Sequence, residues 1–185
     1  MKIYKFLLSA FLVFSTFIYA GGSSDEKPAS EFASDYNKLL TYVENKLVQL
    51  AEAVPQDKMS WRPADGVRSV SEVYLHIAQS AKYLLSALGE DVPQEYNADA
   101  KTFESSTTDP AEVIKSLQKS FGYIKAASLK IDDDKLNTKV NFFGNESSIR
   151  FVLEALLNHV HEHFGQSIAY ARMIGVTPPW SQSDN

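Results

Sequence analysis

The sequence of 185 residues contains no cysteine. This absence excludes disulfide bonds, thiol nucleophiles and thiolate metal ligands, and it also excludes a lipid anchor attached to a cysteine. The fold must therefore be held together by its hydrophobic core. With 44% hydrophobic residues, the chain has the apolar content of one globular domain.

An excess of positive charge is also missing. The chain has 18 lysine and arginine residues against 23 aspartate and glutamate residues, which gives a formal net charge of −5. Because basic side chains that neutralise phosphates supply much of the affinity for nucleic acids, this composition excludes DNA and RNA as partners.

Long uncharged runs are absent except at the start of the chain. Lys2 and Lys5 precede FLLSAFLVFSTFIYA, a run of fifteen uncharged residues over 6–20, and the polar stretch GGSSDEKPAS follows. A basic start, an apolar segment and a small residue such as Ala20 before a polar stretch are typical of a secretory signal peptide. The run is shorter than the roughly 20 residues that span a bilayer, so a retained anchor is the second interpretation.

These observations divide the chain into three parts. We expect a signal peptide over residues 1–20, a flexible linker over 21–29 and one folded domain over 30–180. After cleavage the protein is expected to be periplasmic or secreted, without stable insertion into the membrane.

Helical periodicity dominates the expected domain. Apolar residues recur at intervals of three and four in four segments, at about residues 30–54, 69–88, 109–124 and 147–174. Between the last two, TKVNFF alternates weakly, which predicts a short extended piece. Four amphipathic helices of this length predict an all-α fold, a four-helix bundle.

Two helix starts carry capping residues. In SVSE, Ser69 and Glu72 have the spacing of a capping box, in which each side chain bonds the backbone N–H of the other residue. In DPAE, Asp109 is the expected cap and Pro110 occupies the first helical position. Glu112 is expected to complete a second capping box.

Three of the four histidines lie within residues 159–163, HVHEH. In a helix His159 and His163 project side by side at the edge of the apolar stripe, whereas His161 points away from them. Two imidazoles at this spacing can bind one metal ion, but a third ligand must come from another helix. His76 is the remaining histidine. Spacing alone leaves open both a metal site and a chance pair on a solvated edge.

Two stretches resemble the DinB/YfiT-like family. MSWRPADGVRSVSEVYLHIAQS (59–80) is similar to the segment that joins the family's first two helices, with Trp-Arg-Pro, a glycine, a Ser-Val helix entry and a helical histidine. FFGNESSIRFVLEALLNHVHEHFGQSIAYARMIGVTPPW (142–180) is similar to the family's final helix, with His-x-x-x-His-x-Gly-Gln, Tyr-x-Arg and a Pro-Pro ending. The likeness extends over essentially all of residues 30–180 and implies a four-helix bundle.

The resemblance also implies one divalent metal ion held by three histidines. The implied ligands are His76, His159 and His163. Gln166 and Tyr170 fall on the same face of the last helix and are implied to line or support the site. Imidazole suits zinc, nickel, copper and iron, so the identity of the metal stays open. The chain has Phe164 where relatives commonly carry arginine, a difference expected to alter the charge beside the site.

Three classes of function stay open. The resemblance implies a metal-dependent enzyme, a hydrolase or a thiol transferase, in which the ion lowers the pKa of water or of a thiol. A metal-binding module without turnover and a partner-binding bundle are the alternatives. Turnover requires a general base, and Glu72, one turn before His76, is the carboxylate at a suitable helical offset. The small-molecule substrate and the choice between monomer and homodimer are left open.

Export predicts a processed N-terminus. Mass spectrometry of protein purified from the producing cell should show a chain that starts near Gly21, because signal peptidase cuts after a small residue. A soluble cytosolic protein that still begins at Met1 would contradict export.

Overall fold

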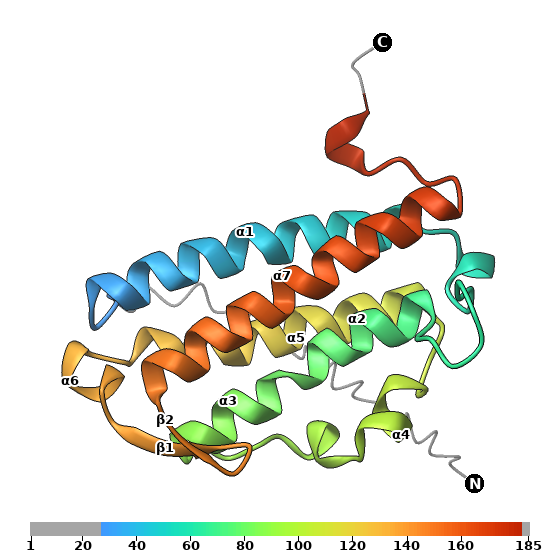
Figure 1. The fold of residues 1–185 in the computed structure, drawn as a ribbon. Coiled ribbons are helices and arrows are strands. Elements are labelled where there is room, and N and C mark those ends of the chain that lie inside the picture. Colours follow the sequence, from blue (N-terminus) through green and yellow to red (C-terminus); the bar gives the residue numbers. More distant parts are fainter. Residues whose placement is uncertain (1–26, 183–185) are drawn as a thin grey trace, which may run out of the picture.

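The computed structural model describes residues 27–182. The predicted signal peptide, residues 1–20, and most of the predicted linker lie outside this range. Within it the chain is mostly helical, and four long helical segments form a bundle (Figure 1). None of the helices in this part of the chain is long and apolar enough to cross a membrane.

The long segments lie where helical periodicity predicts them. They are α1 (Glu31–Ala53), α2 (Val70–Gln79) followed by α3 (Ala81–Leu88), α5 (Pro110–Leu129) and α7 (Ile149–Met173). α1 packs against α5 and α7, and the α2–α3 segment packs against the same two helices (Figure 1). This arrangement places α2 directly beside α7, although α3, α4, α5, α6 and both strands lie between them in sequence.

Short elements connect the long helices. α4 packs on α2, and three 3-10 turns lie in the loops and after α7. The bounds of these elements are η1 Gln56–Lys58, η2 Gln94–Asn97, α4 Ala100–Glu104, α6 Asp133–Leu136 and η3 Pro179–Ser181.

The prediction of one continuous helix over residues 69–88 is wrong at Ser80. The Ser80 hydroxyl and its backbone N–H both donate to the carbonyl of Ile77, and the N–H of Tyr83 bonds the carbonyl of Ser80. A serine that bonds back to the preceding turn competes with the regular helical ladder and bends the helix. The break separates α2 from α3.

The extended piece predicted in TKVNFF is one strand of a hairpin. β1 (Lys139–Phe142) pairs antiparallel with β2 (Asn145–Ser148), and Phe142 lies opposite Asn145. The partner strand was not predicted from the sequence, so the fold is mostly helical with one added hairpin. This hairpin contacts α3 and α7 (Figure 1).

The start of α5 follows the prediction in part. Asp109 caps the helix and Pro110 is its first residue. The prediction of a second capping box is wrong, because the backbone N–H of Asp109 donates to the hydroxyl of Thr107 instead of to Glu112. Glu112 pairs instead with Lys115 on the surface of the helix.

A continuous hydrophobic core fills the space between the helices. All four helical segments contribute side chains with at most 1% exposed surface, and each such burial contributes roughly 1.5–3 kcal/mol relative to exposure. Examples are Leu40, Leu47, Leu84, Leu117, Phe121, Val152 and Leu153. This packing fixes the distance and the rotation of α2 relative to α7, on which the site below depends.

Candidate metal centre

Three histidines from two helices meet between α2 and α7. His76 comes from α2, whereas His159 and His163 come from α7. One ring nitrogen from each lies within 4.8 Å of the others, and the ring centroids are 4.5–4.9 Å apart. A zinc ion with bonds of about 2.0–2.1 Å joins nitrogens up to roughly 4 Å apart. The cluster is therefore close to the size that one ion requires.

The helical phase of α7 separates the pair from its neighbour. His159 and His163 are one turn apart, and both lie on the same side of Val160, which is completely buried. His161 is exposed, and its ring nitrogen contacts only the carbonyl of Leu157 in its own helix. The sequence-based expectation that His161 stands apart from the pair agrees with this geometry.

Gln166 and Tyr170 hold the ring of His163. The side-chain oxygen of Gln166 lies 2.7 Å from Nδ1 of His163, and its amide nitrogen donates to the Tyr170 hydroxyl at 2.9 Å. The Tyr170 ring packs edge-on against Trp61 with centroids 5.5 Å apart. Because an amide oxygen only accepts, Nδ1 of His163 must carry the proton. The Nε2 lone pair is then free for a metal.

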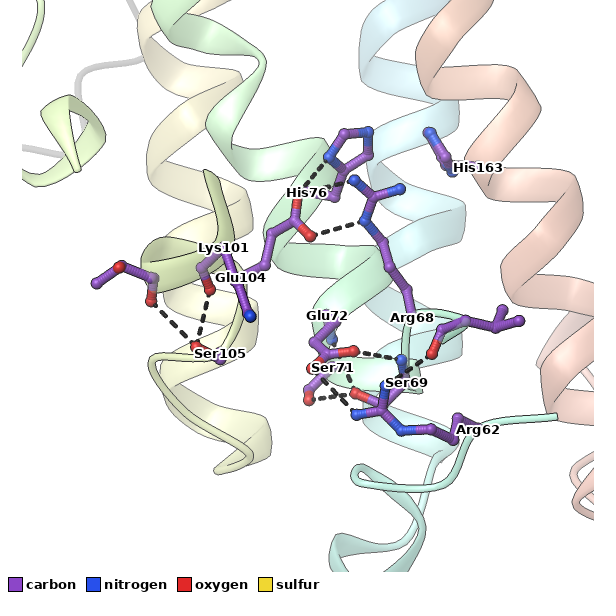
Figure 2. A network of polar contacts seen from close by, with 12 residues as sticks. Arg62, Arg68, Ser69, Ser71, Glu72, His76, Lys101, Glu104, Ser105 and His163 are labelled. Carbon is purple, nitrogen blue, oxygen red and sulfur yellow. Dashed lines mark hydrogen bonds and ion pairs between the residues drawn. The ribbon is translucent and has the colours of Figure 1, made fainter. Parts of the chain in front are cut away.

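Glu104 holds the ring of His76 in the same way. Its Oε1 lies 2.7 Å from Nδ1 of His76, and the carboxylate also accepts from Arg68 at 2.7 and 3.0 Å. Figure 2 shows the carboxylate of Glu104 bonded both to the imidazole of His76 and to the guanidinium of Arg68. An ionised carboxylate only accepts, so His76 also presents Nε2 as its free nitrogen.

Sequence reasoning did not find Glu104 or Arg68. Glu104 ends α4, a helix of five residues, which is too short for a periodic signal, and it lies 28 positions from His76. The one local signal is Asp99, whose side chain caps α4 by accepting from the backbone of Thr102. That cap predicts a helix start, but not the contact of the helix with His76.

Glu72 is directed away from the histidines. Its carboxylate accepts from the backbone N–H of Ser69 at 2.6 Å, which completes the predicted capping box, and from Arg62 at 3.1 Å (Figure 2). Burial opposes ionisation of Glu72, but the hydrogen bonds from Ser69 and Arg62 outweigh burial and lower its pKa. A carboxylate held in this way is a weak base. The geometry therefore does not favour Glu72 as the catalytic base.

Partial burial favours the neutral form of two of the histidines, His76 and His159. Burial, together with repulsion from His163 and His76, lowers the pKa of His159 to about 4. Burial also lowers the pKa of His76, and the hydrogen bond to Glu104 offsets this only in part. Metal ions bind the neutral form of imidazole. His76 and His159 are thus in the form that binds metal. With the rings of His76 and His163 oriented by acceptors, the donor set fits one divalent ion with open positions.

The DinB superfamily model matches residues 39–167 of the chain. The chain belongs to this superfamily. The family predicted from the two quoted stretches is therefore confirmed.

Solved structures share the fold. A DinB-like protein from Bacillus cereus superposes with a TM-score of 0.68 at 22% identity, over 79% of this chain and 95% of that chain. YfiT from Bacillus subtilis, described as a probable metal-dependent hydrolase with an unusual four-helix bundle topology, gives a TM-score of 0.64 at 20% identity, over 78% and 89%. At these identities the likeness establishes the four-helix bundle fold alone. No curated protein matches the chain.

The separation of His161 from the cluster is testable by metal content. We expect His159→Ala to lose bound metal and His161→Ala to retain it, because only His159 presents a nitrogen to the other two histidines. Elemental analysis of both variants, purified in parallel with the wild type, measures the difference. Equal losses in the two variants would show that the helix phase assigned here is incorrect.

The role of Glu104 is testable by metal affinity. Glu104→Ala should weaken zinc binding about 10- to 100-fold, the usual effect of losing the acceptor behind a ligand histidine. Glu104→Gln should lose less, since its amide oxygen can still accept from His76. Competition with a chromophoric zinc chelator gives the affinities, and Glu112→Ala, which removes an exposed carboxylate on α5, is the control. Wild-type affinity in Glu104→Ala would contradict the assignment.

Proposed function

We propose that this chain is an exported, metal-dependent hydrolase that acts on a small molecule, with one divalent ion held by His76, His159 and His163. Three considerations support the proposal: the donor set, membership of the DinB superfamily, and the fold shared with YfiT, itself described as a probable metal-dependent hydrolase. Export rests on the sequence of the first 20 residues.

The observation that carries the proposal is a cavity beside the histidines. A space of about 300 Å³ has His76 and His159 in its wall, next to side chains from α3, α7 and the hairpin. A purely structural metal site is closed by four protein ligands, whereas a catalytic one has three ligands and an open position. Three histidines with a cavity at their side match the second pattern, and the volume is in the range of small-molecule sites.

The chain's own residues divide the work. When bound, a divalent ion with three neutral ligands keeps its positive charge and lowers the pKa of a water molecule or polarises a carbonyl. Glu104 and Gln166 fix the rings of His76 and His163, so the nitrogens need little reorganisation. Arg68 donates two hydrogen bonds to Glu104 and so holds that carboxylate in place beside His76. The apolar walls of the cavity exclude water from a bound substrate.

Group transfer to a thiol is the second candidate, and one observation favours it. Both carboxylates near His76 are already engaged, Glu72 by Ser69 and Arg62 and Glu104 by His76 and Arg68 (Figure 2). Neither is free to remove a proton from water. A thiol, with an ordinary pKa near 8.5, needs less help from a base than water does.

Turnover by the metal-loaded protein tests the proposal. We expect hydrolysis of 4-nitrophenyl butyrate to rise about tenfold or more on loading with zinc, nickel or iron, because a bound ion supplies the nucleophile or polarises the carbonyl. In parallel, glutathione and 1-chloro-2,4-dinitrobenzene test thiol transfer. His163→Ala should abolish the metal-dependent rate and His161→Ala should retain it. Metal binding without turnover in both assays would favour the non-catalytic metal-binding alternative.

A further inference from the structure

The cavity beside the histidines has an apolar interior. Of the described residues that line it, none is an aspartate, glutamate, lysine or arginine, and the polar ones are the two histidines, Ser80 and Tyr83. The apolar walls come from α3, α7 and the hairpin. They consist of Leu84, Phe142, Phe143, Val152, Ala155 and Leu156. Apart from the two histidines, Ser80 and Tyr83, the wall is thus hydrophobic.

Phe143 occupies a backbone conformation that phenylalanine disfavours. Its φ is 51°, and it is the one non-glycine residue with positive φ among residues 27–182. With Gly144 at φ 83° it forms the two-residue loop between β1 and β2. Such loops need positive φ at both positions, for which Asn-Gly is strongly preferred. A side chain other than glycine or asparagine costs about 1–2 kcal/mol there.

Burial does not account for the phenylalanine either. The residue is 68% exposed, yet its ring lies 5.0 Å from the ring of Tyr83 on α3 and 4.5 Å from that of Phe142. These rings belong to the cavity lining. An exposed aromatic ring in a strained turn, at the wall of a cavity, points to a role in covering a ligand.

We propose that this cavity binds the neutral aryl or alkyl part of the substrate, and that Phe143 covers it. The substrate is then a small uncharged molecule whose reacting polar group faces His76 and His159, while its apolar part lies against Leu84 and Leu156. The identity of the reacting group rests on the proposed function. Binding of the apolar part does not, because the walls are present without a metal ion.

An anionic substrate is less well matched. A second groove, on the side of α4, contains Arg62 and Arg68. Both guanidinium groups are already paired, the first with Glu72 and the second with Glu104. Lys101 also lines this groove, but an anion could reach either arginine only by displacing a carboxylate that caps α2 or one that orients His76. The apolar cavity has no such competitor.

Binding of benzyl alcohol to the metal-free protein tests the pocket directly. Carbon-detected methyl spectra should show shifts confined to Leu84, Val152, Ala155 and Leu156. Benzoate should produce none, because no lysine or arginine lines the cavity to pair with it. Ala155→Phe, which fills the cavity, should abolish the shifts. Absence of shifts in the wild type, or equal shifts with benzoate, would overturn the proposal.

Phe143→Asn separates binding from folding. Asparagine suits the loop better than phenylalanine, so the melting temperature should stay equal or rise. Affinity for benzyl alcohol should fall about fivefold, the effect of losing one aromatic contact. Tyr42→Asn removes another exposed aromatic ring, on α1 and outside the cavity lining, and should leave the affinity unchanged. Unchanged affinity in Phe143→Asn would overturn the covering role.

A pair of zinc-binding probes distinguishes the pocket from the metal site. On the zinc-loaded protein, benzohydroxamate should bind about tenfold more tightly than acetohydroxamate, because only the former places a ring in the cavity. Phe143→Asn should reduce this preference. If neither hydroxamate binds while benzyl alcohol does, the result supports the apolar binding pocket and contradicts the metal-dependent function. If both hydroxamates bind equally, the result supports the metal site and contradicts the apolar binding pocket.

Discussion

The packing of α2 against α7 is the contact on which the rest of the site depends. His76 and His159 are 83 positions apart in the sequence, and neither helix alone carries three ligands. The core side chains that set the rotation of the two helices also set where the imidazoles meet. A rotation of α2 by one residue, about 100°, would move His76 away from the groove. The position of the three candidate ligands therefore depends on the hydrophobic core.

Polar contacts then convert this placement into a defined set of donors. A buried carboxylate such as Glu104 costs desolvation energy unless it is fully bonded, and here Arg68 and His76 bond both of its oxygens. The uncharged amide of Gln166 accepts from His163 and donates to the hydroxyl of Tyr170. Acceptors behind the rings fix which nitrogen carries the proton. The positive φ of Phe143 lowers the local stability of the hairpin turn beside the cavity.

The sequence predicts the features that depend on local periodicity. His159 and His163 share a face because they are one turn apart, and the caps at Ser69 and Asp109 mark helix starts within one residue. Features that depend on contacts between residues far apart in the sequence are harder to predict. His76 joins the pair only through the packing of the bundle. In the sequence it was a candidate as the one remaining histidine, and the resemblance to the DinB/YfiT-like family implied it as a ligand.

The features that were missed have specific physical reasons. Glu104 reaches His76 from a helix too short to show a period. The break at Ser80 arises from one hydroxyl group within an otherwise regular apolar stripe. The second strand of the hairpin, Asn145–Ser148, is polar and exposed at its start, and its turn lacks the usual Asn-Gly. In each case the deciding interaction is a single contact that carries no repeating pattern.

The central claim is that ligands on two helices bind one ion. Thermal unfolding tests it most directly, when the wild type and His76→Ala are each measured with and without zinc. A metal that binds only the folded arrangement stabilises it by about 2.7 kcal/mol at a hundredfold excess over its dissociation constant. For a domain of this size that raises the melting temperature by several degrees at pH 7.5. His76→Ala should remain folded and show almost no such rise. Equal melting temperatures of the wild type with and without zinc would contradict the account.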